Sequence, residues 1–210
     1  MKNNKQKGFL ILLAAICFYS CKTTGQFTGS SNLTILIVDE KGCGVRDCAL
    51  TLSNFNKEEH GVTNENGLCI FNNVPSGEYK LVGSKKGYKK MKTENFNYIS
   101  KGEVFCFELY SCSFVFDEVE KLYEQCNFQK TLELLDEIVC DKKSSLYAAI
   151  CFYKAYGYYL QKNQKSALTE LNRMKKADKT FEEIYKEFIT RIEIPDNENE
   201  KEEALWKQKE

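Results

Sequence analysis

The sequence predicts a multidomain β + α chain, in which an antiparallel β-sandwich is followed by an all-α helical domain. Two observations carry this prediction. Between residues 33 and 110, apolar and polar residues alternate with a period of two in short runs, and glycine-containing turns separate the runs, as in antiparallel sandwiches. Beyond residue 114 the apolar period changes to 3.6 and only Gly157 remains as a glycine, as in packed amphipathic helices.

The N-terminal segment, residues 1–20, has the three parts of an export signal. Three lysines precede an apolar run over residues 9–19, and the small residue Ser20 stands before Cys21. The run is too short to cross a bilayer, which takes about 20 apolar residues. With its cysteine, the segment resembles a bacterial lipoprotein signal peptide, which implies that Cys21 becomes the acylated first residue of the mature chain. An ordinary secretory signal and an uncleaved anchor are the alternatives.

This resemblance implies a protein that is lipid-anchored to a bacterial membrane, with the outer membrane favoured, and that faces the periplasm or the cell surface. The composition adds a limit, because 30 basic residues balance 30 acidic ones and the signal takes three of the basic ones. Without a basic excess we expect no nucleic-acid partner, and we expect contact with the lipid bilayer through the acylated N-terminus only. We expect no cofactor apart from the covalent lipid on Cys21.

Residues 21–32 are expected to be the lipidated cysteine and a flexible tether, because the tether residues are small, polar and unpatterned. Five strand-like runs follow, at residues 33–39, 45–54, 67–71, 78–84 and 103–109. Tight turns require residues with special backbone angles, and glycine or proline supplies them at residues 39–42, 64–67 and 75–77.

The same region resembles the carboxypeptidase regulatory-like domain. The residues that match are V-D-x-x-G (38–42), T-N-x-x-G (63–67), F-N-N-V-P-S-G-E-Y (71–79) and K-G-Y (86–88). The resemblance implies a transthyretin-like β-sandwich over residues 33–110, in which the glycines form turns and the tyrosines pack. It also implies an accessory or spacer module without catalytic residues of its own.

Three amphipathic stretches predict helices in residues 114–192. Their apolar residues are Leu132, Leu135, Ile138 and Val139, then Leu168, Leu171 and Met174, and then Phe181, Ile184, Tyr185, Phe188, Ile189 and Ile192. Thr180 and Glu183 predict a capping box at the start of the last helix.

An internal repeat links these helices. Residues 125–131 align with residues 161–167 at a shift of 36, close to the period of about 34 in tetratricopeptide repeats. Small residues fall at matching places, Thr131 and Ala167, and leucines follow at the packing position. The region resembles two degenerate tetratricopeptide repeats with a capping helix, and a plain helical bundle is the alternative.

The tail, residues 193–210, is expected to be disordered, because seven acids stand against three lysines and few residues are apolar. A short helix over residues 202–209, burying Trp206 on a neighbour, is a second interpretation of this segment.

Catalytic and metal-binding patterns are weak in this sequence. His60 is the sole histidine and lies in a polar segment that we expect to be a solvated loop, and no C-x-x-C pair occurs, so we expect no metal. No nucleophile–base pair stands out, and we expect no enzymatic activity. The eight cysteines from Cys43 to Cys151 allow two interpretations, a disulfide framework or buried free thiols.

Aromatic residues crowd the predicted helix around residues 147–159, which indicates a recognition surface. On the tetratricopeptide alignment, the groove residues would be Phe116, Glu120, Tyr123, Ala149, Phe152, Tyr156 and Tyr159. The alternative is that these rings fill the helical core. We therefore expect a non-enzymatic, membrane-anchored adaptor or scaffold that binds a protein or peptide in the cell envelope. Glycan binding by the β-sandwich, by analogy with starch-binding relatives of similar fold, and a purely structural spacer are the alternatives.

Overall fold

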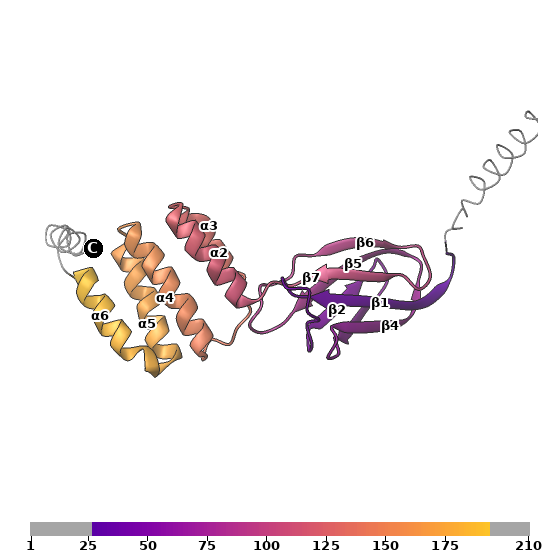
Figure 1. Cartoon of the computed structure of the whole chain (residues 1–210), viewed down its shortest axis with the longest axis horizontal. Helices are drawn as coiled ribbons and strands as arrows, with labels where there is room; N and C mark the ends of the chain where they lie inside the picture. Colours follow the sequence, from indigo (N-terminus) through magenta and orange to yellow (C-terminus); the bar gives the residue numbers. More distant parts are fainter. Residues whose placement is uncertain (1–26, 194–210) are drawn as a thin grey trace, which may run out of the picture.

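The computed structural model describes residues 27–193. The expected signal peptide, Cys21 with residues 22–26 of the tether, and the tail from residue 194 lie outside the described residues. Within them, a β-domain of two sheets is followed by a run of helices, and the molecule is elongated with the two parts at opposite ends (Figure 1). The predicted β + α order is therefore confirmed. No helix between residues 27 and 193 is long and apolar enough to cross a membrane.

Seven strands of the described chain form two sheets. The strands are β1 (Ser30–Val38), β2 (Ala49–Ser53), β3 (Glu58–Val62), β4 (Leu68–Pro75), β5 (Gly77–Ser84), β6 (Glu94–Tyr98) and β7 (Val104–Glu108). Their orders are β4-β1-β7 and β3-β2-β5-β6. All pairs are antiparallel except β1–β7, which is parallel. A wholly antiparallel sandwich was thus a wrong expectation in this one pair, because β1 and β7 are joined by a long crossover through the other sheet instead of a hairpin.

Two strands, β3 and β6, do not appear among the predicted runs. Both lie at the edges of the four-stranded sheet, where one side of the strand faces water, so that polar residues are tolerated and the apolar signal is weak. The expected loop position of His60 is wrong, since His60 lies within β3 opposite Thr51 of β2. At the other end of the domain, β1 begins at Ser30, inside the segment expected to be tether.

The core lies between the two sheets and follows the period-two pattern. Leu33, Ile35 and Ile37 of β1 are fully buried, and they share one cluster with Leu50 of β2 and Leu81 of β5. Burying one such side chain contributes about 1.5–3 kcal/mol, so these alternating residues fix which face of each strand points inward.

Two turns of the sandwich have the same construction. Asp39 Oδ1 accepts hydrogen bonds from the N–H groups of Lys41 and Cys43, and Asn64 Oδ1 accepts them from Asn66 and Leu68. Gly67 then has φ +77°, and a Cβ there would lie 2.3 Å from the carbonyl oxygen of Ile37. Glycine is therefore required at position 67 by both the backbone angle and the close approach.

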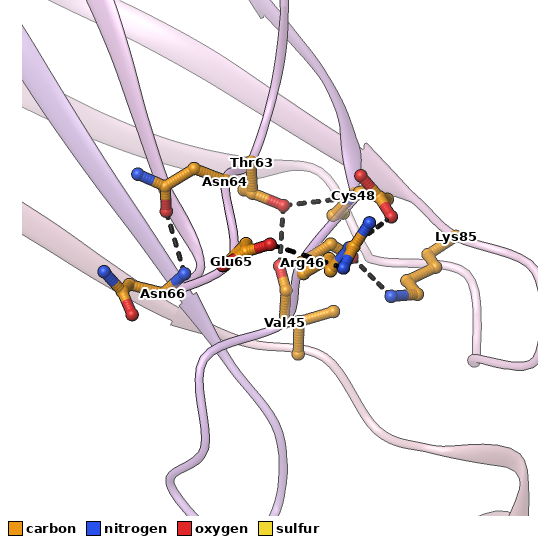
Figure 2. A network of polar contacts seen from close by, with 9 residues as sticks. Val45, Arg46, Cys48, Thr63, Asn64, Glu65, Asn66 and Lys85 are labelled. Carbon is orange, nitrogen blue, oxygen red and sulfur yellow. Dashed lines mark hydrogen bonds and ion pairs between the residues drawn. The ribbon is translucent and has the colours of Figure 1, made fainter.

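Thr63 joins this turn to the preceding loop (Figure 2). Its hydroxyl donates to the carbonyl oxygen of Val45 at 2.6 Å and accepts from the N–H of Cys48 at 2.8 Å. The side chain is only 2% exposed, so both backbone groups depend on this hydroxyl for their hydrogen bonds.

The helical part contains two hairpins and a last helix. The helices are α2 (Cys112–Glu124), α3 (Phe128–Asp136), α4 (Ser145–Leu160), α5 (Gln164–Ala177) and α6 (Glu182–Glu193), with the short 3₁₀ turn η1 (Lys179–Phe181) before α6. Consecutive helices lie side by side along the long axis of the molecule, away from the β-domain (Figure 1).

The α2–α3 and α4–α5 turns are nearly identical, at the shift of 36 that the sequence alignment gave. Cys126 and Lys162 have φ of +55° and +57°, and the side chains of Asn127 and Asn163 cap the next helix. After each turn a small residue is fully buried, Thr131 in one hairpin and Ala167 in the other. The predicted internal repeat is therefore present in the backbone.

The capping box predicted from Thr180 and Glu183 is wrong. Asp178 accepts from the N–H of Thr180 at 2.9 Å and from its hydroxyl at 2.8 Å. Asp178 therefore caps η1, and the chain passes through this 3₁₀ turn before α6 begins.

The eight described cysteines, Cys43 to Cys151, form no disulfide. Cys48, Cys69 and Cys151 are buried, as the free-thiol interpretation expects, and burial raises the pKa of each thiol. Cys43, Cys106 and Cys126 are exposed and do not fit that interpretation.

Candidate functional site

An aromatic row crosses α2, α4 and α6. Phe116, Phe152 and Phe188 stand at equal intervals of 36 residues, one in each of these three helices. Residues at the same position of successive repeats come to lie along one face of the stacked helices. We define the aromatic row by its seven rings, Phe116, Tyr123, Phe152, Tyr153, Tyr156, Tyr159 and Phe188.

Two ring contacts join α2 to α4. Phe116 stacks on Tyr153 with ring centroids 5.0 Å apart, and Tyr123 meets Tyr156 edge to face at 5.4 Å. The hydroxyl of Tyr123 also donates to the backbone carbonyl of Tyr153. Gly157 allows this approach, since a Cβ there would lie 2.7 Å from the Tyr123 hydroxyl.

Phe188 joins α4 to α6. Its ring lies 5.6 Å from that of Phe152 and 5.5 Å from that of Tyr159, both edge to face. Tyr156 lies 6.4 Å from the same ring. The aromatic row is thus continuous across all three helices, and each contact has the edge-to-face or offset geometry that aromatic pairs prefer.

The rings of the row differ in exposure. Phe188 is buried, Tyr156 is 37% exposed, and the other five are half-buried. Two further residues expected in the groove lie on the same helices. Ala149 is half-buried on α4, and Glu120 is exposed on α2. The rings therefore pack the helices together and still present part of their surface to solvent.

A polar edge accompanies the rings on the α2 side. Tyr153 donates its hydroxyl proton to Glu120 Oε1 at 2.9 Å. Burial and the neighbouring acids Glu120 and Asp117 raise the pKa of Tyr153, and burial also raises the pKa of Tyr123. Both phenols therefore remain protonated donors at neutral pH, and Tyr153 lies beside carboxylates that favour a positively charged ligand group.

Sequence reasoning missed two members of the row, Tyr153 and Phe188, as groove residues. Phe188 was assigned only to an apolar stripe, although its interval of 36 residues from Phe152 was visible in the sequence. Tyr153 was missed because the alignment placed its neighbour Phe152 in the groove, and no periodicity shows that the Tyr153 ring meets α2.

The described chain holds no constellation for metal chemistry. Among residues 27–193, no group of three or more histidine, cysteine, aspartate or glutamate side chains could hold a metal ion. His60 lies in the open on β3, with Nδ1 3.2 Å from the Thr51 hydroxyl and Nε2 3.4 Å from Glu58.

Comparisons with known proteins give fold-level likeness only. No family model and no curated protein matches the sequence. Similar solved structures include the Bacillus anthracis TIE protein, with 19% identity and a TM-score of 0.36 over 40% of this chain and 17% of that one. The group B streptococcus pilus 2b backbone protein has 15% identity and a TM-score of 0.33, over 39% of this chain and 41% of that one.

A DUF3823 family protein from Bacteroides ovatus is also similar, with 15% identity and a TM-score of 0.33 over 38% of this chain and 44% of that one. The match spans less than half the length of each of these three chains. At such low scores the likeness decides nothing about function, and the β-sandwich followed by helices rests on the strand pairing given above.

Proposed function

We propose that this protein is a non-enzymatic adaptor or scaffold of the bacterial cell envelope, which binds a protein or peptide partner along the aromatic row. The observation that carries the proposal is the continuity of the row across three helices, with Tyr156 left 37% exposed at its centre. Aromatic rings with hydroxyl groups suit protein recognition, because they combine a large rigid contact area with hydrogen-bond donors.

The finer fold assignment belongs to the same proposal. We assign the helical domain to the tetratricopeptide-like class and the sandwich to the transthyretin-like, carboxypeptidase regulatory-like class. The support for the first is that a turn, a cap and a phenylalanine all recur at one interval of 36 residues. A plain helical bundle has no reason to repeat all three features at a single interval.

The acidic residues beside the aromatic row restrict the class of peptide that can bind there. On the α2 side of the row, Asp117 and Glu120 are exposed acids beside Tyr153. A segment that places apolar side chains on the rings and a lysine or arginine near these acids satisfies both parts of the surface. We therefore propose a peptide segment with mixed apolar and basic residues.

Site-directed photo-crosslinking in the cells of origin tests this function. A photoreactive phenylalanine analogue at position 156 of the full-length protein is expected to give a discrete adduct with one protein. The same analogue at position 70, where Ile70 is 57% exposed on the β-domain, is the matched control and should not give that adduct. No adduct from position 156, or the same adduct from both positions, would contradict the adaptor function.

Membrane attachment through Cys21 is the second part of the proposal, and it rests on the sequence of residues 1–21. Metabolic labelling with a palmitate analogue should mark the wild-type protein and Cys17→Ser, but not Cys21→Ser. The Cys21→Ser protein should also be absent from the membrane fraction after cell fractionation. If Cys21→Ser stays labelled, the lipoprotein assignment is wrong.

A further inference from the structure

A cavity of about 480 Å³ lies on the β-domain, bounded by β2, β5, β6 and the turn after β2. Small-molecule sites in proteins have volumes of about 300–1,000 Å³, so its size suits a small-molecule ligand. The cavity is separate from the aromatic row, since all its lining residues belong to the sandwich.

Four polar side chains of the cavity form a block on the outer face of the sheet. Glu78 of β5 stands opposite Asn97 of β6, and Lys80 stands opposite Asn95. All four are exposed, while Tyr79, between the two β5 residues, is buried. No hydrogen bond or ion pair to another described residue occupies these four side chains, which are therefore free to bond a ligand.

Phe55 stands at the rim of this cavity and is 97% exposed. Its turn is closed by hydrogen bonds, because the N–H of Asn54 donates to the carbonyl of Lys57 at 2.9 Å. Asn54 Oδ1 also accepts from the N–H groups of Asn56 and Lys57 at 2.9 and 2.8 Å. Because the turn is already formed, little backbone conformational entropy is lost when a ligand covers the ring.

We propose that this cavity binds a neutral saccharide, with the Phe55 ring against the apolar face of a sugar ring and Asn95 and Asn97 on its hydroxyl groups. A side-chain amide donates and accepts hydrogen bonds at once, as sugar hydroxyls do. Glu78 and Lys80 add an acceptor and a donor whose charges cancel, which leaves no net attraction for phosphate or another anion.

Other ligand chemistries fit the same walls less well. A wholly apolar ligand would remove water from Glu78, Lys80 and the two asparagines without replacing their hydrogen bonds. An anionic ligand would meet the carboxylate of Glu78. A neutral, hydroxyl-rich ligand is the class that uses both the ring and the four polar groups.

The test begins with the full-length protein in detergent on an array of neutral and acidic oligosaccharides. The neutral oligosaccharide that binds best is then titrated calorimetrically against wild type, Phe55→Ala and the double variant Asn95→Ala/Asn97→Ala. We expect each variant to lower the affinity at least about tenfold. Because Phe55 is almost fully exposed, its removal should leave the urea midpoint unchanged, so a loss of affinity reports the site and not the fold.

Ile70→Ala is the matched control, because Ile70 is an exposed apolar residue of the other sheet of the same domain, and it should keep the saccharide affinity of wild type. The proposal is overturned if no neutral oligosaccharide binds, if only acidic ones bind, or if Phe55→Ala binds as tightly as wild type. Because Phe55 and Tyr156 lie in different domains, failure of this site leaves the adaptor function untouched, and the reverse also holds.

Discussion

Thr63 shows how one hydroxyl can hold a loop. Its side chain bonds two backbone groups, the carbonyl of Val45 and the N–H of Cys48, in a position where water is excluded (Figure 2). In addition, its own N–H donates to Cys48 and its carbonyl accepts from Asp47. The loop between β1 and β2 is therefore tied to the end of β3 by four hydrogen bonds at a single residue.

We expect Thr63→Val to destabilise the protein by about 2–4 kcal/mol, because it keeps the side-chain shape and leaves two buried backbone groups unpaired at about 1–3 kcal/mol each. Urea denaturation measures the change. Thr51→Val is the control, since the Thr51 hydroxyl bonds only the exposed His60 ring. Equal midpoints for Thr63→Val and wild type would show that water replaces the hydroxyl.

The packing of Tyr123 of α2 against α4 depends on the absence of a side chain at Gly157. Alanine has a higher helix propensity than glycine by about 1 kcal/mol, so Gly157→Ala would stabilise an isolated helix. Here a Cβ would meet the Tyr123 hydroxyl at 2.7 Å and its ring at 3.2 Å. Because the same hydroxyl donates to Tyr153, moving it breaks a hydrogen bond between α2 and α4.

We expect Gly157→Ala to destabilise the folded protein by about 1–2 kcal/mol, since displacing Tyr123 outweighs the propensity gain. A double-mutant cycle with Tyr123→Phe, followed by urea denaturation, separates the two effects. In the phenylalanine background the nearest clash is absent, so Gly157→Ala should be less damaging there. A loss of equal size in both backgrounds would contradict the contact.

At the scale of the element, the repeated turn explains why the two helical hairpins match. Each turn has one residue at positive φ followed by an asparagine that caps the next helix, Asn127 before α3 and Asn163 before α5. Asn127 accepts from the N–H of Lys130 at 3.4 Å, and Asn163 accepts from that of Ser166 at 3.2 Å.

Removing either cap should weaken its hairpin to a similar extent. We expect Asn127→Ala and Asn163→Ala each to lower the free energy of unfolding by about 1 kcal/mol, because each leaves a helix N-terminus without its side-chain acceptor. Thermal unfolding followed by circular dichroism measures this, with exposed Lys130→Ala as the control. A large loss at one site only would mean that the two turns are not energetically equivalent.

The last helix, α6, differs on one face from α2 and α4, the helices at the corresponding place in each hairpin. The positions of Val115 in α2 and Cys151 in α4, both buried, correspond to Glu187 in α6. Glu187 pairs instead with Arg191 at 2.8 Å, and both side chains are more than half exposed. The face that packs on a second helix in each hairpin is therefore charged in α6, which suits a helix that ends the stack.

At the scale of the whole molecule, a backbone ladder joins the two domains. In the loop after β5, the N–H of Gly87 donates to the carbonyl oxygen of Val139 at 2.8 Å. The N–H of Val139 in turn donates to the carbonyl oxygen of Tyr88 at 2.9 Å. The carbonyl oxygen of Gly87 accepts a hydrogen bond from the N–H of Cys112 at the start of α2. Lys89 and Glu137 add an ion pair of 2.9 Å across the junction. Such bonds restrict the hinge motion that a simple linker would allow.

Glu40 adds a pH-sensitive contact to the junction. Its carboxylate accepts from the N–H of Ser111 at 3.0 Å and from the Ser111 hydroxyl at 2.6 Å, at the N-cap of α2. Partial burial acts to raise the pKa of Glu40, but the hydrogen bonds from Ser111 outweigh it and lower the pKa below its ordinary value of 4.5. The contact therefore stabilises the fold above that ordinary value, and its contribution is lost as the pH falls through the lowered pKa.

We expect Glu40→Gln to be less stable than wild type at about pH 7. The difference should shrink as the pH falls below 4.5 and through the lowered pKa of Glu40, where the wild-type carboxylate takes up a proton too. Urea midpoints of the two proteins across this range measure the effect. Glu65→Gln is the control, because Glu65 is 85% exposed and should show no such change. A difference between Glu40→Gln and wild type that grows on acidification would contradict this account.

The sequence by itself determined the parts whose signal is local. Alternating apolar residues such as Leu33, Ile35 and Ile37 define a buried strand face, and the repeated turn residues define two helical hairpins. For the candidate groove, the sequence predicted that its residues on α2 and those on α4 belong to two helices of one repeat series. These predictions succeed because backbone propensity and side-chain period are properties of a few neighbouring residues.

Only the tertiary structure decided the features that join distant segments. The strands β3 and β6, the parallel pairing of β7 with β1, and the junction between Gly87 and Val139 depend on partners far away in the chain. The meeting of Phe188 with Phe152 depends in the same way on how the helices stack. Such contacts leave little local pattern. Backbone groups are the same in every residue, and a ring in one helix gives no sign of the distant ring that it meets, so only the fold brings these groups together.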